Sequence, residues 1–180
     1  MLELGNQFLC AGSKPYPDFP SHLIGMDANA PIIAKPYFES LGYEHVSIDL
    51  NGRNGTLVHD LSKPFDLRRQ FDIVTDFGTS EHVSCLWACL RNVHVHTKAE
   101  GLIFHANPAP GNWSDHGYWY RNEAFYARFA ELSGYALLET FRVACAGNFV
   151  DGWLTCALLR KTREEFVDKD AFYTLPLCDR

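Results

Sequence analysis

Residues 71–82 have the sequence FDIVTDFGTSEH, a short, mostly apolar run followed by glycine and two hydroxyl residues. Phe71 to Phe77 predicts a strand that ends at Gly78, after which Thr79 or Ser80 can cap a helix. Apolar side chains then recur at spacings of three and four, which predicts one apolar helix face: Val83, Leu86, Trp87, Leu90 and Val93. A strand followed directly by a helix is the repeating unit of a parallel α/β sheet.

The same alternation of strand and helix extends along the chain in both directions. We expect six further strands, at residues 1–4, 46–50, 56–59, 101–106, 136–143 and 153–159. We expect further helices at about 32–41, with Pro36 in its first turn, and before Gly134, with Phe125, Phe129 and Leu132 on its apolar face. Only a loop separates the last two strands, so one of them should be antiparallel.

The length of 180 residues predicts one domain over 1–180, with a core over 1–161 and a C-terminal tail over 162–180 that forms a surface helix and tail. Residues 6–31 are rich in Pro, Gly, Ser and Asp and are expected to form a long loop or lid. His94 and His96, at the end of the long helix, are expected to face solvent.

The composition favours a small-molecule partner over nucleic acid or a membrane. The net charge of −6 argues against a broad phosphate-binding surface, and no apolar run is long enough to span a bilayer. The six cysteines form no CxxC pair and lie mostly in apolar segments, as buried thiols do in a reducing compartment. With no export leader evident, we expect a cytoplasmic protein of unspecified oligomeric state.

Four segments carry a resemblance to a known family: Glu3-Leu4-Gly5, Asp49 after its strand, His59-Asp60-Leu61, and residues 71–82. In this order they resemble the class I S-adenosylmethionine-dependent methyltransferases, over Met1 to about Lys161. The resemblance implies an α/β fold, a Rossmann-like three-layer sandwich with a mainly parallel seven-stranded sheet and an antiparallel last strand. It also implies a methyltransferase that uses S-adenosylmethionine and methylates oxygen or nitrogen of a small-molecule acceptor.

The resemblance implies that the cofactor binds where the strands end, because ligands of open α/β sheets bind beyond their carboxyl ends. Gly5 would let the backbone approach the methionine part, Asp49 would accept from the ribose hydroxyls, and Asp60 would accept from the adenine amino group. The methionine amine and the methyl group would lie along Asp76 to Gly78. The implied cofactor-binding residues are Glu3, Gly5, Asn6, Asp49, Leu50, Asp60, Leu61, Asp76, Phe77 and Gly78.

The sequence departs from the family pattern after its first glycine. Asn6, Gln7, Phe8 and Leu9 follow Gly5 where further small residues are expected, so the glycine loop is incomplete. The gap from Gly5 to Asp49 far exceeds the roughly 20 residues of the dinucleotide-binding analogue, which requires an insertion. A methyltransferase-like binding or accessory protein without turnover is therefore the alternative function.

Three histidines are candidate catalytic bases, because imidazole titrates near neutral pH. They are His82, beside the expected methyl site, His105, late in a strand, and His116, in an aromatic loop. The alternative to a catalytic role is that His82 is simply an exposed residue in the first turn of the helix, and that His105 is a buried histidine whose hydrogen bonds are satisfied.

Residues 107–120 form an irregular segment rich in aromatic side chains. Trp113, Tyr118 and Trp119 are predicted to form walls of the substrate site, unless the loop folds them back onto the domain. Asp115 and His116 suggest two ligands of a metal, but no third ligand stands out by spacing, so we predict no metal site. Asn107-Pro108 lacks the aromatic completion of the nucleic-acid amino methylase signature, which disfavours DNA methylation.

Overall fold

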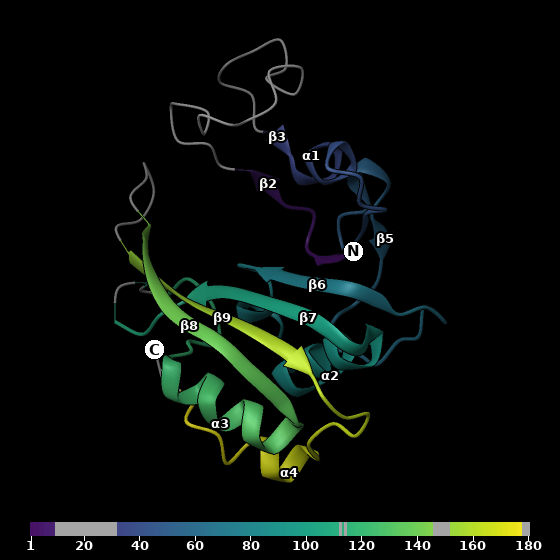
Figure 1. The fold of residues 1–180 in the computed structure, drawn as a ribbon. Helices are drawn as coiled ribbons and strands as arrows, with labels where there is room; N and C mark the ends of the chain where they lie inside the picture. The colour runs from purple at the N-terminus through teal and green to yellow at the C-terminus, as the bar shows by residue number, and fades with distance from the viewer. Residues whose placement is uncertain (10–31, 112, 114, 146–151, 178–180) are drawn as a thin grey trace.

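A seven-stranded sheet forms the centre of the computed structural model, which describes residues 1–9, 32–111, 113, 115–145 and 152–177. The strand order is β5-β4-β1-β6-β7-β9-β8 (Figure 1). The strands are β1 (Leu2–Leu4), β4 (Val46–Asp49), β5 (Leu57–Val58), β6 (Phe71–Phe77), β7 (Thr97–Pro108), β8 (Tyr135–Cys145) and β9 (Gly152–Lys161). The first five are parallel, and β9 runs antiparallel to both β7 and β8. The predicted Rossmann-like sheet with an antiparallel last strand is confirmed.

The chain between β1 and β4 forms a small separate sheet and a helix. Strand β2 (Phe8–Leu9) pairs antiparallel with β3 (Ile32–Ile33), and α1 (Ala34–Ser40) follows with Pro36 in its first turn, as predicted. Most of the expected long loop, residues 10–31, lies outside the described residues. In Figure 1, α1 lies with β2 and β3 on one side of the large sheet, whereas α3 and α4 lie on the other.

The helix after β6 begins later than the capping residues predict. A short 3-10 helix, η3 (Ser80–His82), comes first, and α2 runs from Leu86 to His96. Neither predicted cap acts as one, because both hydroxyls bind elsewhere: Thr79 Oγ1 donates to the Leu4 carbonyl at 2.9 Å and Ser80 Oγ donates to Asp76. The turn from Gly78 to Cys85 thus stays tied to the sheet edge instead of starting the helix.

Helix α3 (Glu123–Ser133) has the ends that its sequence predicts. The Asn122 side chain accepts from the Phe125 amide at 2.9 Å, and Gly134 ends the helix with a φ of +64°. Both long helices bury their apolar stripes against the sheet, through Leu86, Cys89, Leu90 and Val93 of α2 and Phe125, Phe129 and Ala130 of α3. None of the helices in the described ranges is both long and apolar enough to cross a membrane.

The segment after β9 was expected to form a surface helix and tail, and up to residue 177 it holds a short helix, α4 (Lys169–Phe172), with mostly exposed residues. It is not a loose tail, however, because Val167, Phe172 and Leu175 are buried in the main core. The expectation that His94 and His96 face solvent is wrong, since both are buried. His94 bonds to the Tyr135 hydroxyl at 2.7 Å and to the Glu164 carbonyl at 2.8 Å, which joins α2 to the C-terminal segment.

Candidate functional site

A pocket of about 480 Å³ opens at the carboxyl ends of the parallel strands. Its walls come from the segments that follow β1, β4, β5 and β6, together with part of the aromatic loop. This is where ligands of open α/β sheets bind, and the volume lies in the range of small-molecule sites. The lining residues are Gln7, Asp49, Leu50, His59, Asp60, Leu61, Ser62, Gly78, Thr79, His82, Val83, Ser84 and Tyr118.

The turn after β1 requires a glycine. Gly5 has a φ of +82°, and its amide donates to the Ile48 carbonyl at 2.7 Å. A Cβ at Gly5 would lie only 2.4 Å from Nε2 of Gln7, whose side chain folds across the glycine and donates to Thr79 Oγ1 at 2.8 Å. Gln7, and not Gly5 or Asn6, therefore forms this wall of the pocket.

Asp49 and Leu50 line the pocket at the end of β4. The Asn6 amide donates to Asp49 Oδ2 at 3.0 Å, and the Asn51 amide donates to Oδ1 at 2.9 Å. Each carboxylate oxygen keeps a second lone pair, so the side chain can still accept hydrogen bonds from a ligand. Leu50 presents an apolar side chain that is 70% exposed.

The segment after β5 supplies Asp60 and Leu61. Ser62 donates to Asp60 Oδ1 through its amide at 3.0 Å and its hydroxyl at 2.6 Å, and these bonds lower the pKa of Asp60. Asp60 is thus a fixed carboxylate at the pocket wall. His59 also lines the pocket and stacks on Phe65 with ring centroids 4.7 Å apart.

Asp76 is not part of the pocket, contrary to the predicted cofactor set. Its side chain is fully buried and accepts from the Ser80 amide at 3.0 Å and from His105 Nδ1 at 2.8 Å, with the Arg121 guanidinium 3.8 Å away. Burial disfavours the carboxylate, but His105 and Arg121 more than offset it and hold the pKa of Asp76 below its usual value. Asp76 therefore anchors the turn after β6.

His105, another predicted catalytic histidine, lies in the same buried network and is not among the residues that line the pocket. Its side chain is 1% exposed and its Nδ1 faces Asp76. Burial lowers the pKa of His105, which leaves a neutral ring that donates to the carboxylate. His105 thus has the environment of the alternative prediction, that of a buried histidine whose hydrogen bonds are satisfied.

Two other predicted cofactor residues also lie away from the pocket lining. Glu3 is buried in β1, where its Oε2 lies 3.4 Å from Nε2 of His45. Phe77 packs edge-on against Phe104 on β7, with centroids 5.4 Å apart. Gly78 does line the pocket, with a φ of +64°.

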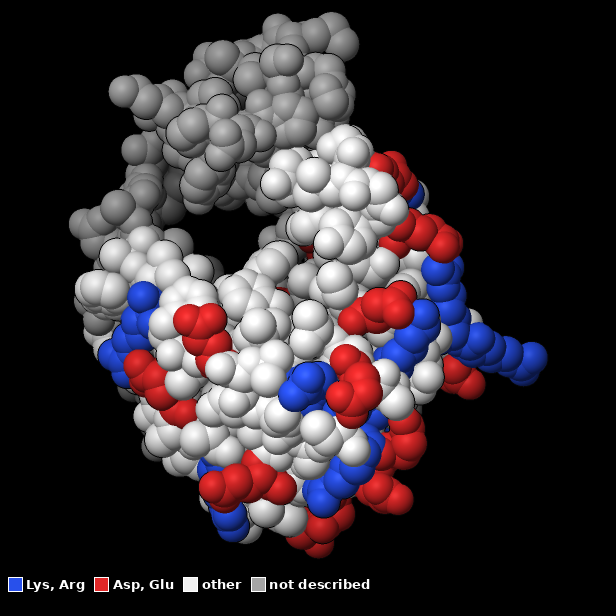
Figure 2. All heavy atoms as spheres, viewed as in Figure 1, with Lys and Arg blue, Asp and Glu red and all other residues white. Residues whose placement is uncertain are grey.

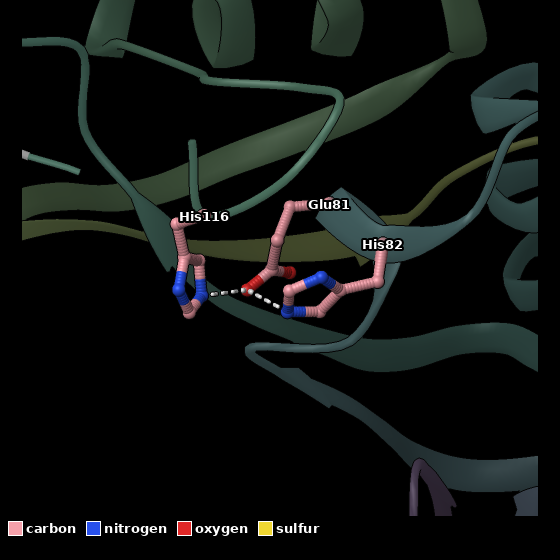
Figure 3. A group of neighbouring side chains, drawn as sticks. All are labelled: Glu81, His82 and His116. Carbon is pink, nitrogen blue, oxygen red and sulfur yellow. Dashed lines mark ion pairs between the residues drawn. The ribbon is translucent and has the colours of Figure 1, made fainter. Parts of the chain in front are cut away.

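Glu81, His82 and His116 come together in one cluster (Figure 3). Gly78 is adjacent, since Glu81 Oε1 lies 3.4 Å from the position that a Cβ of Gly78 would take. Nε2 of each histidine lies 3.7 Å from Glu81 Oε1, and the two rings approach that oxygen from different sides. Burial, reinforced by the negative charge of Asp76, raises the pKa of Glu81 to about 7. Burial also lowers the pKa of His82. Sequence reasoning selected both histidines but missed the glutamate between them.

The aromatic loop is divided between the pocket and the protein body. Tyr118 lines the pocket and is 55% exposed. Trp113 and Trp119 instead donate their indole N–H groups to the carbonyls of Trp153 and Val83, each at 2.7 Å, and neither lines the pocket. The predicted substrate wall is therefore reduced to Tyr118, and the two tryptophans follow the alternative of folding back.

Sequence reasoning also missed several residues of the lining: Gln7, His59, Ser62, Thr79, Val83 and Ser84. Gln7, His59, Ser62 and Thr79 lie within three residues of a predicted strand end, so that position was the available signal, whereas Val83 and Ser84 lie six and seven residues beyond Phe77. Gln7 was seen only as a departure from the glycine pattern, whereas it is a pocket wall.

Comparison with solved structures finds the same fold at low sequence identity. The chain is similar to 1,6-didemethyltoxoflavin-N1-methyltransferase from Burkholderia thailandensis, solved with 1,6-didemethyltoxoflavin and S-adenosylhomocysteine (TM-score 0.58, 16% identity, 72% of this chain and 66% of that one). It is also similar to TehB from Haemophilus influenzae (TM-score 0.54, 14% identity, 71% and 53%). A third is the N-methyltransferase NodS from Bradyrhizobium japonicum WM9, in complex with S-adenosylhomocysteine (TM-score 0.51, 16% identity, 90% and 77%).

The chain spans 66% and 53% of the lengths of the first two of these proteins. No family model and no curated protein matches the sequence. The likeness therefore concerns the fold alone. The chain has the Rossmann-like fold of the class I S-adenosylmethionine-dependent methyltransferases.

Proposed function

We propose that this protein binds S-adenosylmethionine and transfers its methyl group to oxygen or nitrogen of a small-molecule acceptor. The observation that carries the proposal is the pocket itself, whose walls are the ends of four neighbouring parallel strands. Two carboxylates, Asp49 and Asp60, stand at the ends of β4 and β5, where this fold would hold ribose and adenine. Two of the similar solved proteins hold S-adenosylhomocysteine.

The cofactor would lie across the strand ends in a fixed direction. Asp49 would accept from the ribose hydroxyls, and Asp60 with the Leu61 backbone would meet the adenine. Gly78, which lines the pocket with a left-handed φ of +64°, would lie by the methionine part. Asp76 would act indirectly, by fixing the turn through Ser80 and His105.

The acceptor would enter beside Tyr118 and His82, which line the pocket next to Gly78. Methyl transfer is an in-line displacement, so the protein mainly has to align the acceptor atom with the methyl group. Lysine, arginine and acidic side chains are interspersed on the face seen in Figure 2, which supports a small molecule over a polyanion. Buried thiols at Cys89 and Cys156 support our proposal of a cytoplasmic protein.

One observation favours the alternative of a binding protein without turnover. The Gln7 side chain covers Gly5 and reaches Thr79, and so takes the space in which the cofactor's methionine part would approach the glycine. Turnover requires Gln7 to move aside or to bind the methionine part itself. A protein in which it does neither would keep the fold and lose the reaction.

The proposal is tested by incubating the protein with S-adenosylmethionine and pools of small hydroxyl and amine compounds, and measuring S-adenosylhomocysteine formed. We expect formation above the acceptor-free control with at least one pool, and slower formation by Asp49→Ala when S-adenosylmethionine is not saturating. If S-adenosylhomocysteine binds but no pool supports its formation, the binding-protein alternative gains support. If it does not bind, both versions of the proposal fail.

A further inference from the structure

Glu81 has a buried carboxylate oxygen to which no described residue donates a hydrogen bond. The side chain is 0% exposed, and Oε1 lacks a hydrogen-bond partner among the residues that the structure describes, whereas Oε2 accepts from Asn107 Nδ2 at 3.1 Å. A buried carboxylate oxygen that lacks a partner is costly. The groups that face Oε1 are the two Nε2 atoms of His82 and His116, both beyond hydrogen-bond distance at 3.7 Å.

We propose that Glu81, His82 and His116 form a binding site for a divalent transition-metal ion such as Zn²⁺, placed where the two imidazoles and the carboxylate oxygen converge (Figure 3). One atom from each side chain lies within 4.8 Å of the others. In a tetrahedral zinc site with bonds of about 2.1 Å, ligand atoms lie roughly 3.4 Å apart. Small side-chain rotations therefore bring the three groups into coordination.

The donor set determines the class of metal. Two imidazole nitrogens and one carboxylate oxygen suit Zn²⁺ and its neighbours, whereas Ca²⁺ and Mg²⁺ prefer oxygen ligands. Three protein ligands leave at least one coordination position open. The side chains of His82 and His116 are 48% and 34% exposed, so the open position is accessible from solvent, and His82 also lines the pocket.

The surrounding backbone holds the three ligands in place. Gly117 lies so close to Glu81 that a Cβ there would be 2.9 Å from the Glu81 carbonyl oxygen, and the Tyr118 amide donates to that carbonyl at 2.8 Å. The His116 amide contacts the Tyr120 hydroxyl at 3.1 Å. Asn107 fixes the second oxygen of Glu81, which is the kind of supporting contact that metal ligands usually have.

Because the cluster lies next to Gly78, a bound ion could take part in methyl transfer, and this part of the inference rests on the proposed function. A cation there would bind an acceptor oxygen or nitrogen beside the methyl group and lower the pKa of an acceptor hydroxyl. Metal binding itself needs neither cofactor nor acceptor, and so it can be measured alone.

The experiment is calorimetric titration of Zn²⁺ into the untagged full chain after chelator treatment, without cofactor. We expect one ion per chain, and for His82→Ala, His116→Ala and Glu81→Gln a loss of affinity at least as large as the roughly 10–100-fold that removal of a supporting residue costs. Asn107→Ala removes the hydrogen bond to Glu81 Oε2 and should itself weaken Zn²⁺ binding by roughly 10–100-fold. His59→Ala, at a pocket histidine outside the cluster, is the matched control and should bind as the wild type does.

Cobalt separates this site from the cysteines. Co²⁺ bound by imidazole and carboxylate shows weak visible bands, whereas thiolate ligation adds an intense near-ultraviolet band. We expect the first spectrum, and its loss in His116→Ala with thermal unfolding unchanged. Absence of binding, or binding that the three ligand variants leave intact, would overturn the proposal. S-adenosylhomocysteine should bind His116→Ala as tightly as wild type, so failure of the metal site and failure of the proposed function are distinguishable.

Discussion

The Asn6 amide donates to Oδ2 of Asp49 at 3.0 Å, a contact that joins the turn after β1 to the end of β4. The Asp49 carboxylate thus fixes the turn after β1 and also lines the pocket. The two strand ends are neighbours in the sheet although 43 positions separate the residues. This relationship locates the ribose end of the proposed site.

Asp49→Ala should weaken S-adenosylhomocysteine binding by about 1–3 kcal/mol, because charge-assisted hydrogen bonds to the ribose are lost. Calorimetry measures the change. The matched control is Asp66→Ala, which removes an exposed turn aspartate that accepts from the Arg68 amide outside the pocket. Equal affinity of Asp49→Ala and the control would contradict the ribose role.

Gln7→Ala should bind S-adenosylhomocysteine more tightly than the wild type, because the side chain that covers Gly5 is removed. We expect a gain of several-fold, on the order of the 1 kcal/mol net value of one hydrogen bond that no longer has to be broken. Weaker binding would show instead that Gln7 contacts the ligand. The direction of the change in affinity therefore shows whether the Gln7 side chain blocks the ligand or binds it.

Asp76→Ala should lower the free energy of unfolding by about 3–5 kcal/mol, because it leaves Arg121 buried without its carboxylate partner. Urea denaturation measures this difference. Asp72→Ala on the same strand is the control, since its ion pair with Lys98 is exposed and should contribute about 0–1 kcal/mol. A small effect of Asp76→Ala would mean that the buried network does not anchor the turn.

His94 should make stability depend on pH on the acid side. Burial lowers its pKa from 6.5 to about 4 in the folded protein. Between pH 6.5 and pH 4 the unfolded chain binds a proton at His94 that the folded chain does not, so the free energy of unfolding falls as the pH drops through this range. Below pH 4 His94 makes no further change to the free energy of unfolding. The slope from this group is at most about 1.4 kcal/mol per pH unit.

The measurement compares urea unfolding of the wild type and His94→Asn from pH 7 to pH 4. The variant is expected to be less stable at pH 7 and to lose less stability on acidification. Parallel curves for the two proteins would contradict the assignment, since His94 would then titrate alike in the folded and unfolded states.

The sheet could be predicted because each strand is marked by local signals. Gly78 and Gly134 end their elements as expected, and apolar spacing located α2 and α3. The antiparallel position of β9 followed from the short connection after β8. Such signals are local in sequence and need no knowledge of packing.

The errors concern polar residues whose partners are distant in sequence. Asp76 was predicted to line the pocket, but it is buried, in a hydrogen bond with His105 and an ion pair with Arg121. His94 looked exposed because its partner Tyr135 lies 41 positions away. Glu81 was missed because its significance comes from His116, which only the folded loop brings near. No local pattern shows which polar groups will meet across the fold.

Calorimetric titration of the wild-type chain with S-adenosylhomocysteine, with NAD as the control ligand, tests the central claim most directly. We predict saturable one-to-one binding of S-adenosylhomocysteine at micromolar concentrations, and none of NAD at the same concentrations. Absence of S-adenosylhomocysteine binding, or equal binding of NAD, would contradict the claim that the pocket at the strand ends is built for this cofactor.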